Sequence, residues 1–174
     1  FVWLRQLLEF QKEVADPEEF YESVKVDLFP EDVYVFTPKG DVKSLPRGAT
    51  PVDFAYAVHS EVGHRCSGAR VNGAIVPLRH KLQNGDVVEV MTSKKHHPSK
   101  DRLEFVITSR ARGRIRAYLR TEERKQAVKL GKELLEKELR KNKMSLSRFL
   151  KSKRANEILS RFHVGTEEEL YARI

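Results

Sequence analysis

The fold of this chain is decided by residues 33–92, which read VYVFTPKGDVKSLPRGATPVDFAYAVHSEVGHRCSGARVNGAIVPLRHKLQNGDVVEVMT. Val33 to Phe36 form a continuous β-branched and aromatic run, a composition typical of a buried strand. Pro38 to Asp41 have turn chemistry, and Val42 to Leu45 can form a second strand. The segment therefore predicts a β-hairpin at its start.

A helix with a strong start signal follows this hairpin. Thr50, Pro51 and Asp53 have the spacing of an N-cap, a first-turn proline and the acidic partner of a capping box. We expect one crossover helix that ends before Gly63. Its inward face is predicted to carry Val52, Ala55, Tyr56 and a half-buried His59 near the C-terminal end.

Three further strands are predicted after the helix. Arg70-Val71 and Ala74 to Val76 flank Asn72-Gly73, a strong signal for a two-residue hairpin, and Val87 to Met91 follow a second Asn-Gly pair. The order ββαβββ predicts an α+β fold in which one helix crosses a small mixed sheet. This is the pattern of a β-grasp, or ubiquitin-like, domain.

Helices are predicted on both sides of this domain. Apolar residues recur at helical spacing from Trp3 to Lys12, and Asp16-Pro17 starts a second helix that reaches Phe29. Residues 94–101 are polar and without period. A long helix is predicted from Ser109 to Lys141, with Gly113 and Thr121-Glu122 as candidate breaks. Two short helices are predicted to follow. Ser145 is the N-cap signal of the first, and Thr166 with Glu169 has the spacing of a capping box at the start of the second, just after Gly165.

Charge is distributed unevenly over the 174 residues. The formal net charge is +8, but residues 94–154 alone contribute +14, against −5 in 1–31, +1 in 32–93 and −2 in 155–174. A basic block of this kind favours a polyanionic partner, because binding phosphates releases condensed counterions. The alternative is a solvated helix surface rich in Lys and Glu.

Several classes of protein are disfavoured by composition. No apolar run is long enough to predict a membrane span, and the N-terminal residues lack a signal-peptide layout. The single cysteine, Cys66, fits a reducing compartment. The chain begins with Phe1 rather than Met and stops within a helical pattern, so we expect a segment of a longer protein, cut at both ends.

Arginines in the basic block are regularly spaced. Arg112, Arg116, Arg120 and Arg124 recur every fourth residue and therefore share one helical face, while Arg110 and Arg114 start a second row. Like charges at this spacing repel, whereas the planar guanidinium suits bidentate binding of phosphate. The spacing predicts an RNA-contacting helix.

Signals for catalysis and for metal binding are weak. There is no glycine-rich phosphate loop of the P-loop type, no HExxH motif and no paired cysteines. His59, His64 and Cys66 lie close in sequence, but they lack the four-ligand spacing of structural zinc sites. We therefore expect no metal, no cofactor and no catalytic residue here.

The motifs YVFTPKGD and DFAYAVHSEVGHRC resemble a TGS domain, and the following TSRARGRIR resembles the RelA/SpoT family of long stringent-response proteins. The initial WLRQLLEFQK is similar to the end of that family's synthetase domain. The resemblance implies four parts. These are a helical linker from the synthetase domain at 1–31, the TGS domain at 32–93, a loop or linker at 94–108, and a partial helical domain at 109–174.

The resemblance also implies a function. Members of the family are cytoplasmic bacterial enzymes that make and degrade (p)ppGpp in N-terminal domains absent from this chain, and their C-terminal region senses deacylated tRNA on the ribosome. The histidine of VGHRC, His64, is implied to meet the 3′ CCA end of the tRNA. We expect it in a loop, with Arg65 and Arg70 near phosphates.

The expected partners are deacylated tRNA, ribosomal RNA and the protein's own synthetase and hydrolase domains. The expected RNA-contacting residues are His64, Arg65, Arg70, Arg110, Arg112, Arg114, Arg116 and Arg120. One alternative is a protein-interaction or autoinhibitory module for acyl carrier protein or another regulator. A domain of a threonyl-tRNA synthetase or Obg-type GTPase is disfavoured by the flanking motifs.

Overall fold

The computed structural model describes residues 31–161 and 163–174. The two helices predicted before residue 31 lie outside the described residues. The chain consists of two compact units, with the boundary between Leu119 and Arg120. Each unit is treated by itself below.

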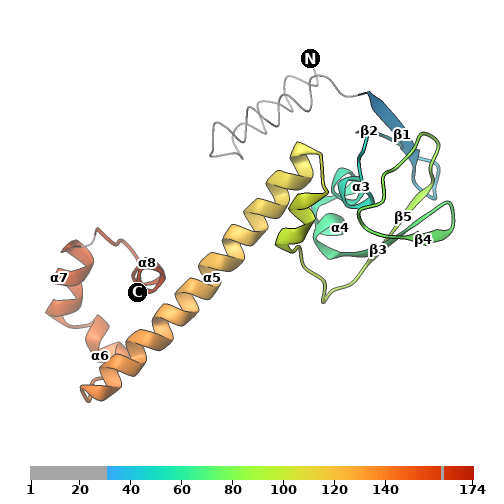
Figure 1. The fold of residues 1–174 in the computed structure, drawn as a ribbon. Coiled ribbons are helices and arrows are strands. Elements are labelled where there is room, and N and C mark those ends of the chain that lie inside the picture. Colours follow the sequence, from blue (N-terminus) through green and yellow to red (C-terminus); the bar gives the residue numbers. More distant parts are fainter. Residues whose placement is uncertain (1–30, 162) are drawn as a thin grey trace. The chain divides into compact units, whose positions relative to one another are not determined.

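The strands of the first unit confirm the α+β, β-grasp prediction (Figure 1). The antiparallel hairpin of β1 (Asp32–Phe36) and β2 (Val42–Pro46) pairs Tyr34 with Ser44. A three-stranded antiparallel sheet has the order β4-β3-β5, with bounds Ala74–Val76, Cys66–Val71 and Val88–Thr92. One parallel bridge between Phe36 and Val87 joins hairpin and sheet, which makes the arrangement mixed.

The tight turn between β3 and β4 is the one predicted from sequence. Asn72 and Gly73 both have positive φ, 52° and 84°, which is the backbone of a two-residue hairpin with Asn-Gly at its centre. The side chain of Asn72 also accepts a hydrogen bond from the Val87 amide (2.9 Å) and donates to Asp86 (3.0 Å). The asparagine thus ties this turn to the start of β5.

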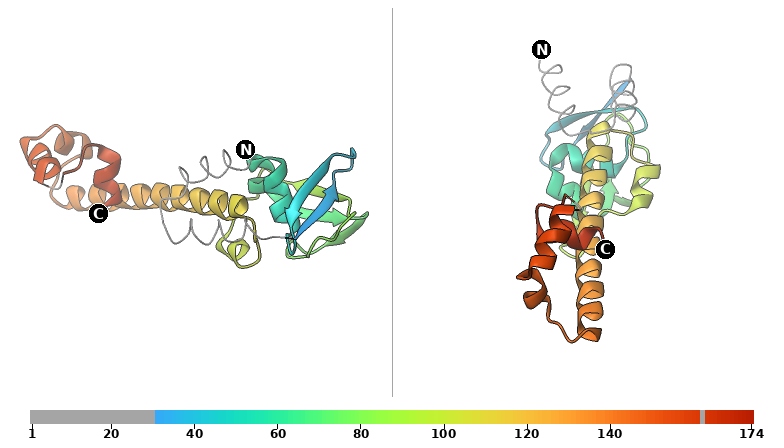
Figure 2. Two further views of the ribbon diagram at one scale, coloured as in Figure 1. Left: turned by 90° about the horizontal axis from the view of Figure 1, so that it is seen from above. Right: turned by 90° about the vertical axis from the view of Figure 1, so that its left-hand side faces the viewer.

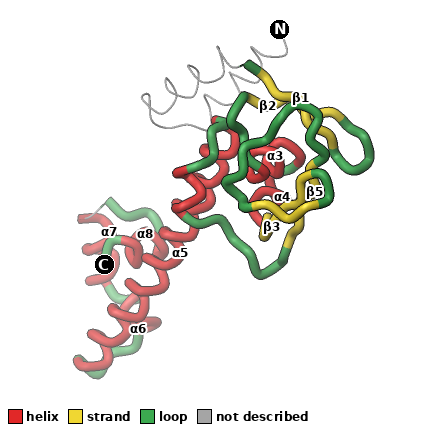
Figure 3. Tube along the Cα trace, turned by 45° about the vertical axis from the view of Figure 1, so that its right-hand side comes forward, coloured by secondary structure: helices red, strands yellow, loops and turns green. Residues whose placement is uncertain are grey.

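The prediction of a single crossover helix was wrong, because two short helices occupy this segment. α3 (Pro51–Val58) and α4 (Ser60–Arg65) meet at His59, whose backbone is extended (φ −163°, ψ 146°). The His59 side chain is exposed and accepts a hydrogen bond from the Glu61 amide (3.1 Å), so it caps α4 and does not face inward. Both helices lie on one side of the strands (Figures 2 and 3).

The start of α3 and the interior of α4 show why these residue types stand there. Thr50 and Asp53 form the predicted reciprocal capping box. Gly63 lies within α4 instead of beyond a helix end, and a Cβ on it would come within 2.3 Å of the Tyr56 ring. A side chain at position 63 would therefore push the two helices apart.

Two apolar clusters form the core of the first unit. One fills the space between α3 and the strands, around Val35, Phe54 and Val88. The other contains Tyr56 and Cys66 together with Val106, Ala111 and Ile115, all of them fully buried. The second cluster shows that the segment after β5 and the first turns of the next helix belong to the same core.

A 3₁₀ helix, η1 (Lys100–Glu104), forms within the range predicted as a loop or linker. Its Arg102 is 2% exposed and donates hydrogen bonds to the carbonyls of Gly63 (3.1 Å) and Cys66 (2.5 Å) at the end of α4. A guanidinium at a helix C-terminus satisfies carbonyls that have no partner within the helix. The buried cation therefore fixes this segment to α4.

The long helix α5 (Ser109–Lys141) is continuous through Gly113 and Thr121, so neither candidate break exists. In the second unit it is followed by α6 (Leu146–Leu150), α7 (Lys153–Arg161) and α8 (Glu167–Ala172). A Cβ on Gly131 would meet the Tyr171 carbonyl oxygen at 1.8 Å. Glycine thus allows the backbone of α8 to pack directly on α5.

The N-caps predicted in the second unit are confirmed. Ser145 and Thr166 each accept a hydrogen bond from the amide three residues later. Glu169 does not complete a reciprocal box, because its carboxylate accepts from the Gly165 amide (2.8 Å). The left-handed residue after α7 is His163 (φ 51°) and not Gly165. None of the described helices is long and apolar enough to cross a membrane.

Candidate functional site

His64 lies in the last turn of α4, not in a loop as expected, because α4 continues through Gly63 to Arg65. Its side chain is half-buried, and Nδ1 is 3.0 Å from the Tyr56 hydroxyl. Tyr56, from α3, is fully buried. The imidazole is therefore held by the core of the domain along one ring edge.

Aromatic rings from four segments form a continuous series of contacts that includes His64. The rings of Tyr56 and His64 meet edge to face, with centroids 5.4 Å apart. Tyr118 of α5 lies 5.0 Å from His64 and 5.9 Å from His97, and its ring is nearly parallel to that of His97. We call Tyr56, His64, His97 and Tyr118 the ring cluster.

Burial lowers the pKa of His64. The nearby charges of Arg114, Arg102 and His97 lower it further, and only Glu61 raises it. Together, burial and these charges keep the imidazole neutral around pH 7. A neutral imidazole has one donor nitrogen and one acceptor nitrogen, so the tautomer decides which hydrogen bond it offers.

Burial likewise raises the pKa of the Tyr56 phenol, against the charge and the hydrogen bond of the Arg102 guanidinium, which lower it. The hydroxyl is therefore protonated throughout the physiological range. Arg102 serves two structural purposes, since it also donates to the carbonyls of Gly63 and Cys66.

The basic helix is fixed to the β-grasp core by a buried carboxylate. Asp53 of α3 accepts hydrogen bonds from the Ile107 amide (3.1 Å), the Thr108 amide (2.9 Å) and the Thr108 hydroxyl (2.8 Å). The Thr108 hydroxyl in turn accepts from the Ala111 amide (3.2 Å) and so caps the first turn of α5. This network determines where α5 begins relative to α3.

Two of the predicted arginines form exposed ion pairs on the domain surface. Arg65 pairs with Glu61 (3.2 Å) on α4, and Arg70 pairs across the sheet with Glu89 (3.9 Å). Such exposed pairs contribute at most about 1 kcal/mol, so a phosphate can replace the carboxylate at small cost. The phosphate contact of either arginine stays a prediction.

The arginines of α5 differ in exposure. Arg110 and Arg120 are exposed, whereas Arg112, Arg114 and Arg116 are half-buried. Arg112 donates from Nε to the Val106 carbonyl (3.1 Å), so part of its side chain supports the connection before the helix. The regular row in the sequence thus combines structural and exposed guanidinium groups. Arg120 is the first residue of the second unit.

Sequence reasoning missed the residues that hold His64 in place. Tyr56 was predicted only as a core residue, and Tyr118, His97 and Arg102 were not singled out. A tyrosine within the arginine-rich stretch 110–120 was the one visible signal, because aromatic rings among basic residues are typical of nucleic-acid surfaces. Nothing in the sequence indicates the contacts of Arg102.

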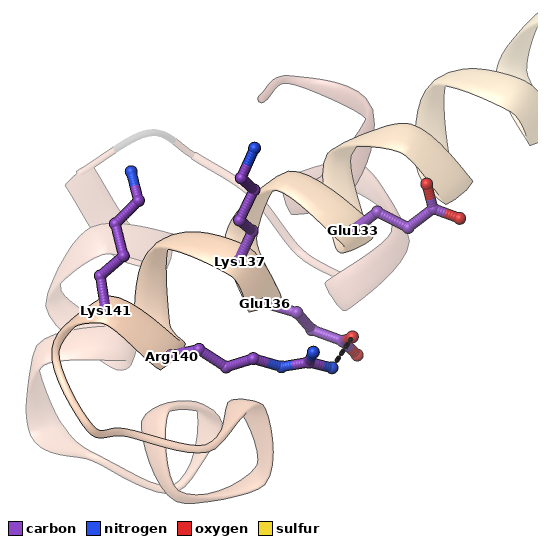
Figure 4. A pocket seen from close by; sticks show the side chains of 5 residues that line it. All are labelled: Glu133, Glu136, Lys137, Arg140 and Lys141. Atoms are coloured by element: carbon purple, nitrogen blue, oxygen red, sulfur yellow. Dashed lines mark ion pairs between the residues drawn. The ribbon is translucent and has the colours of Figure 1, made fainter.

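Other features of the described residues carry little chemistry. Among the residues that the structure describes, no group of three His, Cys, Asp or Glu side chains is placed to hold a metal ion. A shallow hollow on α5 is lined by its own polar side chains, with an ion pair between Arg140 and Glu136 (3.7 Å; Figure 4). Its lining is the mixed-charge surface of a solvated helix: Glu133, Glu136, Lys137, Arg140 and Lys141.

Comparison with protein families agrees with this geometry. The family model of the TGS domain matches residues 33–92, and that of the RelA/SpoT AH domain matches residues 118–174. The fold and its flanking helices therefore define a TGS domain followed by a regulatory helical domain. Together the two matches show that the chain belongs to the RelA/SpoT family.

Curated relatives point to the same family. The chain is 61% identical over 152 residues to a protein of Myxococcus xanthus named GTP pyrophosphokinase, covering 87% of this chain and 20% of the relative. It is 48% identical over 174 residues to the bifunctional (p)ppGpp synthase/hydrolase RelA of Mycobacterium tuberculosis, covering 99% of this chain and 24% of the relative. The chain thus spans about a fifth to a quarter of the length of these relatives.

A third relative carries a hydrolase name. The chain is 50% identical over 172 residues to a protein of Synechocystis named probable guanosine-3′,5′-bis(diphosphate) 3′-pyrophosphohydrolase, covering 99% of this chain and 22% of the relative. Relatives named for synthesis and for hydrolysis therefore share this region at similar identity.

Proposed function

We propose that this chain is the RNA-sensing regulatory part of a cytoplasmic (p)ppGpp synthetase, with or without hydrolase activity. It would read the 3′ CCA end of deacylated tRNA on the ribosome and control the synthetase and hydrolase domains of its own protein. In this proposal the chain itself contributes no catalytic residue. The observation that carries it is the contact between His64 and Tyr118, which joins the VGHRC histidine to the basic helix in one compact unit.

The chemistry of this contact suits the end of an RNA strand. Imidazole and phenol rings stack on unpaired bases, and imidazole nitrogens form hydrogen bonds with base edges or ribose hydroxyls. Because His64 is half-buried between α3 and α5, the surrounding rings leave limited freedom around it. A close fit to the free terminal ribose would exclude an esterified amino acid by steric clash.

The basic helix would supply affinity in this arrangement, while the ring cluster supplies selectivity. Arg110 is exposed in the first turn of α5, two residues after Thr108 of the Asp53 network, and Arg114 lies near enough to His64 to lower its pKa. Phosphate contacts give binding energy that does not depend on base identity. The fixed start of α5 would therefore hold the phosphate-binding groups at a constant distance from His64.

The proposal can be tested by measuring the affinity of the ribosome-bound protein that carries this chain for deacylated and for aminoacylated tRNA. We expect preference for deacylated tRNA, and we expect His64→Glu to weaken its binding by about tenfold or more, the size of one lost base contact. His96→Glu, the same substitution at an exposed histidine, is the matched control and should preserve the preference. Equal binding of both tRNAs by the unmodified protein would refute the proposal.

The role of the arginines is tested by the salt dependence of binding. Arg110→Gln should weaken binding of both tRNAs equally and should reduce the slope against salt by up to about one, the value for one phosphate contact. Arg148→Gln, an exposed arginine of α6, is the comparison. An unchanged slope for Arg110→Gln would show that Arg110 contacts no phosphate.

Docking of acyl carrier protein, or of another acidic regulator, is the alternative use of the same basic surface. Such docking would depend on Arg110 but not on the ring contacts of His64. Binding of acyl carrier protein that is lost in Arg110→Glu and kept in His64→Glu, without any tRNA preference, would favour this alternative.

A further inference from the structure

The burial of the Tyr56 hydroxyl determines the direction of its bond to His64. Tyr56 is fully buried, and its hydroxyl oxygen lies 3.0 Å from His64 Nδ1. A buried hydroxyl that donates to no acceptor loses the hydrogen bond that it made with water, so its proton is best placed on Nδ1. The positive charge of Arg102, which lies near enough to lower the pKa of Tyr56, also favours a hydroxyl proton that points away from the guanidinium. We therefore assign Tyr56 as the donor in this bond and Nδ1 as the acceptor.

An accepting Nδ1 leaves the proton of a neutral imidazole on Nε2. The neutral form is consistent with the surroundings of His64. On the neighbouring elements, Arg102 of η1, Arg114 of α5 and His97 disfavour a positive charge, and only Glu61 of α4 favours it. The far edge of the ring is thus a donor N–H, fixed in orientation by Tyr56 and by the ring of Tyr118.

We infer that Tyr56 is a positioning residue that holds His64 as the Nε2–H tautomer, so that His64 donates a hydrogen bond to an acceptor atom of the bound RNA end. The inference rests on the proposed function for the identity of the ligand. It adds that the RNA must offer an acceptor, such as a ribose, phosphate or base oxygen or a base nitrogen.

Imidazole ¹⁵N chemical shifts of the 174-residue chain test the tautomer directly, without any ligand. We expect His64 to show a protonated Nε2 and an unprotonated Nδ1 at pH 7.5. In Tyr56→Phe the ring remains but the donor is lost, so the spectrum should move towards a mixture of the two tautomers. Tyr34→Phe, which removes an exposed hydroxyl on β1, is the matched control and should leave His64 unchanged.

A protonated Nδ1 in the unmodified chain, or an unchanged His64 spectrum in a folded Tyr56→Phe variant, would overturn the inference. If Tyr56→Phe does not fold, the unmodified chain still decides the tautomer. A role of Tyr56 limited to packing would not change the protonation of one ring nitrogen. The ¹⁵N measurement therefore separates positioning from stability.

Substitutions at His64 test the donor in the presence of RNA. The amide nitrogen of glutamine reaches about as far as Nε2, whereas asparagine reaches only to the position of Nδ1. On ribosomes with deacylated tRNA we expect His64→Gln to keep more affinity than His64→Asn, and His64→Glu, which carries no donor at that point, to lose the most. Equal loss in Gln and Glu variants would overturn the need for a donor.

These outcomes distinguish the inference from the proposed function. If the unmodified protein does not prefer deacylated tRNA, the proposed function fails whatever the tautomer. If the preference is present but Tyr56→Phe leaves both the ¹⁵N shifts and the preference unchanged, only the inference about Tyr56 fails.

Discussion

The two units of this chain achieve their packing by different means. In the first, buried polar side chains connect segments distant in sequence, as Asp53 does with Thr108 and Arg102 does with Gly63. In the second, packing depends on close backbone approach at Gly131 and on a few buried apolar residues near the C-terminus. Among the described residues, the buried polar and charged side chains all belong to the first unit, where Asp53 and Arg102 fix the positions of α5 and α4.

The largest expected effect comes from removing the carboxylate that fixes α5 to α3. Asp53→Ala leaves several buried donors without an acceptor, and each costs about 1 to 3 kcal/mol, so the free energy of unfolding of the first unit should fall by about 3 kcal/mol or more. Native-state hydrogen exchange should show lost protection in residues 31–119 and little change in α7 and α8. Asp41→Ala, in an exposed turn, is the control.

A loss below about 1 kcal/mol in Asp53→Ala would mean that this network does not stabilise the first unit. It would also remove the contrast between the two units, because the polar contacts would then be incidental to packing.

Glycine substitutions probe each unit separately. Gly63→Ala places a Cβ 2.3 Å from the Tyr56 ring, and Gly131→Ala places one 1.8 Å from the Tyr171 carbonyl. Each substitution should lower the free energy of unfolding of its own unit by about 1 to 3 kcal/mol, because the neighbouring atoms must move to make room. Thermal or urea unfolding monitored by hydrogen exchange measures the loss in each unit. Gly165→Ala, whose Cβ has room, should change stability little. A loss in the other unit would show that the two units unfold together.

The pH dependence of stability should be specific to the first unit. Burial lowers the folded pKa of His64 below its unfolded value of about 6.5, so the unfolded chain binds the proton more readily. The stabilising contribution of neutral His64 is complete above about pH 6.5 and is lost as the pH falls towards the lowered folded pKa. His64→Gln should flatten this acid slope in urea titrations. If His64→Gln shows the same acid slope as the unmodified chain, His64 is not the group responsible for the pH dependence.

The smallest effect is expected for an apolar residue of α5 in the second unit. Leu130 is 58% exposed. Leu130→Gln should change the free energy of unfolding by less than about 0.5 kcal/mol, because little apolar surface leaves water at this site on folding. A clear loss of stability would show that Leu130 packs against something in solution, and sedimentation would then test for self-association.

Much of the fold could be predicted because it depends on local signals. The hairpin at Asn72-Gly73, the capping box of Thr50 and the long helix from Ser109 each follow from short-range preferences, and the structure confirms them. The single crossover helix was wrong because His59 can either continue a helix or cap a new one. Packing of Gly63 against Tyr56 favours the second arrangement, and sequence periodicity does not report that contact.

The candidate site could be predicted only in part. His64 and the arginines were found by resemblance and by spacing, but the surroundings of His64 were not. Tyr118 lies 54 positions further along the chain, and its ring meets His64 only because Asp53 holds the start of α5. Such contacts between distant residues depend on how elements pack, and local preferences do not encode the result.

The order of the strands, the turn chemistry, the position of the positive charge and the family motifs could be predicted from the sequence, since each of these is a property of neighbouring residues. Packing between distant segments decides that Arg102 and Asp53 are buried, that Arg112 supports a backbone carbonyl, and that the Tyr56 hydroxyl lies 3.0 Å from His64 Nδ1. Local sequence does not encode these contacts, because the same polar side chain is solvated on a surface but must find a partner once packing excludes water.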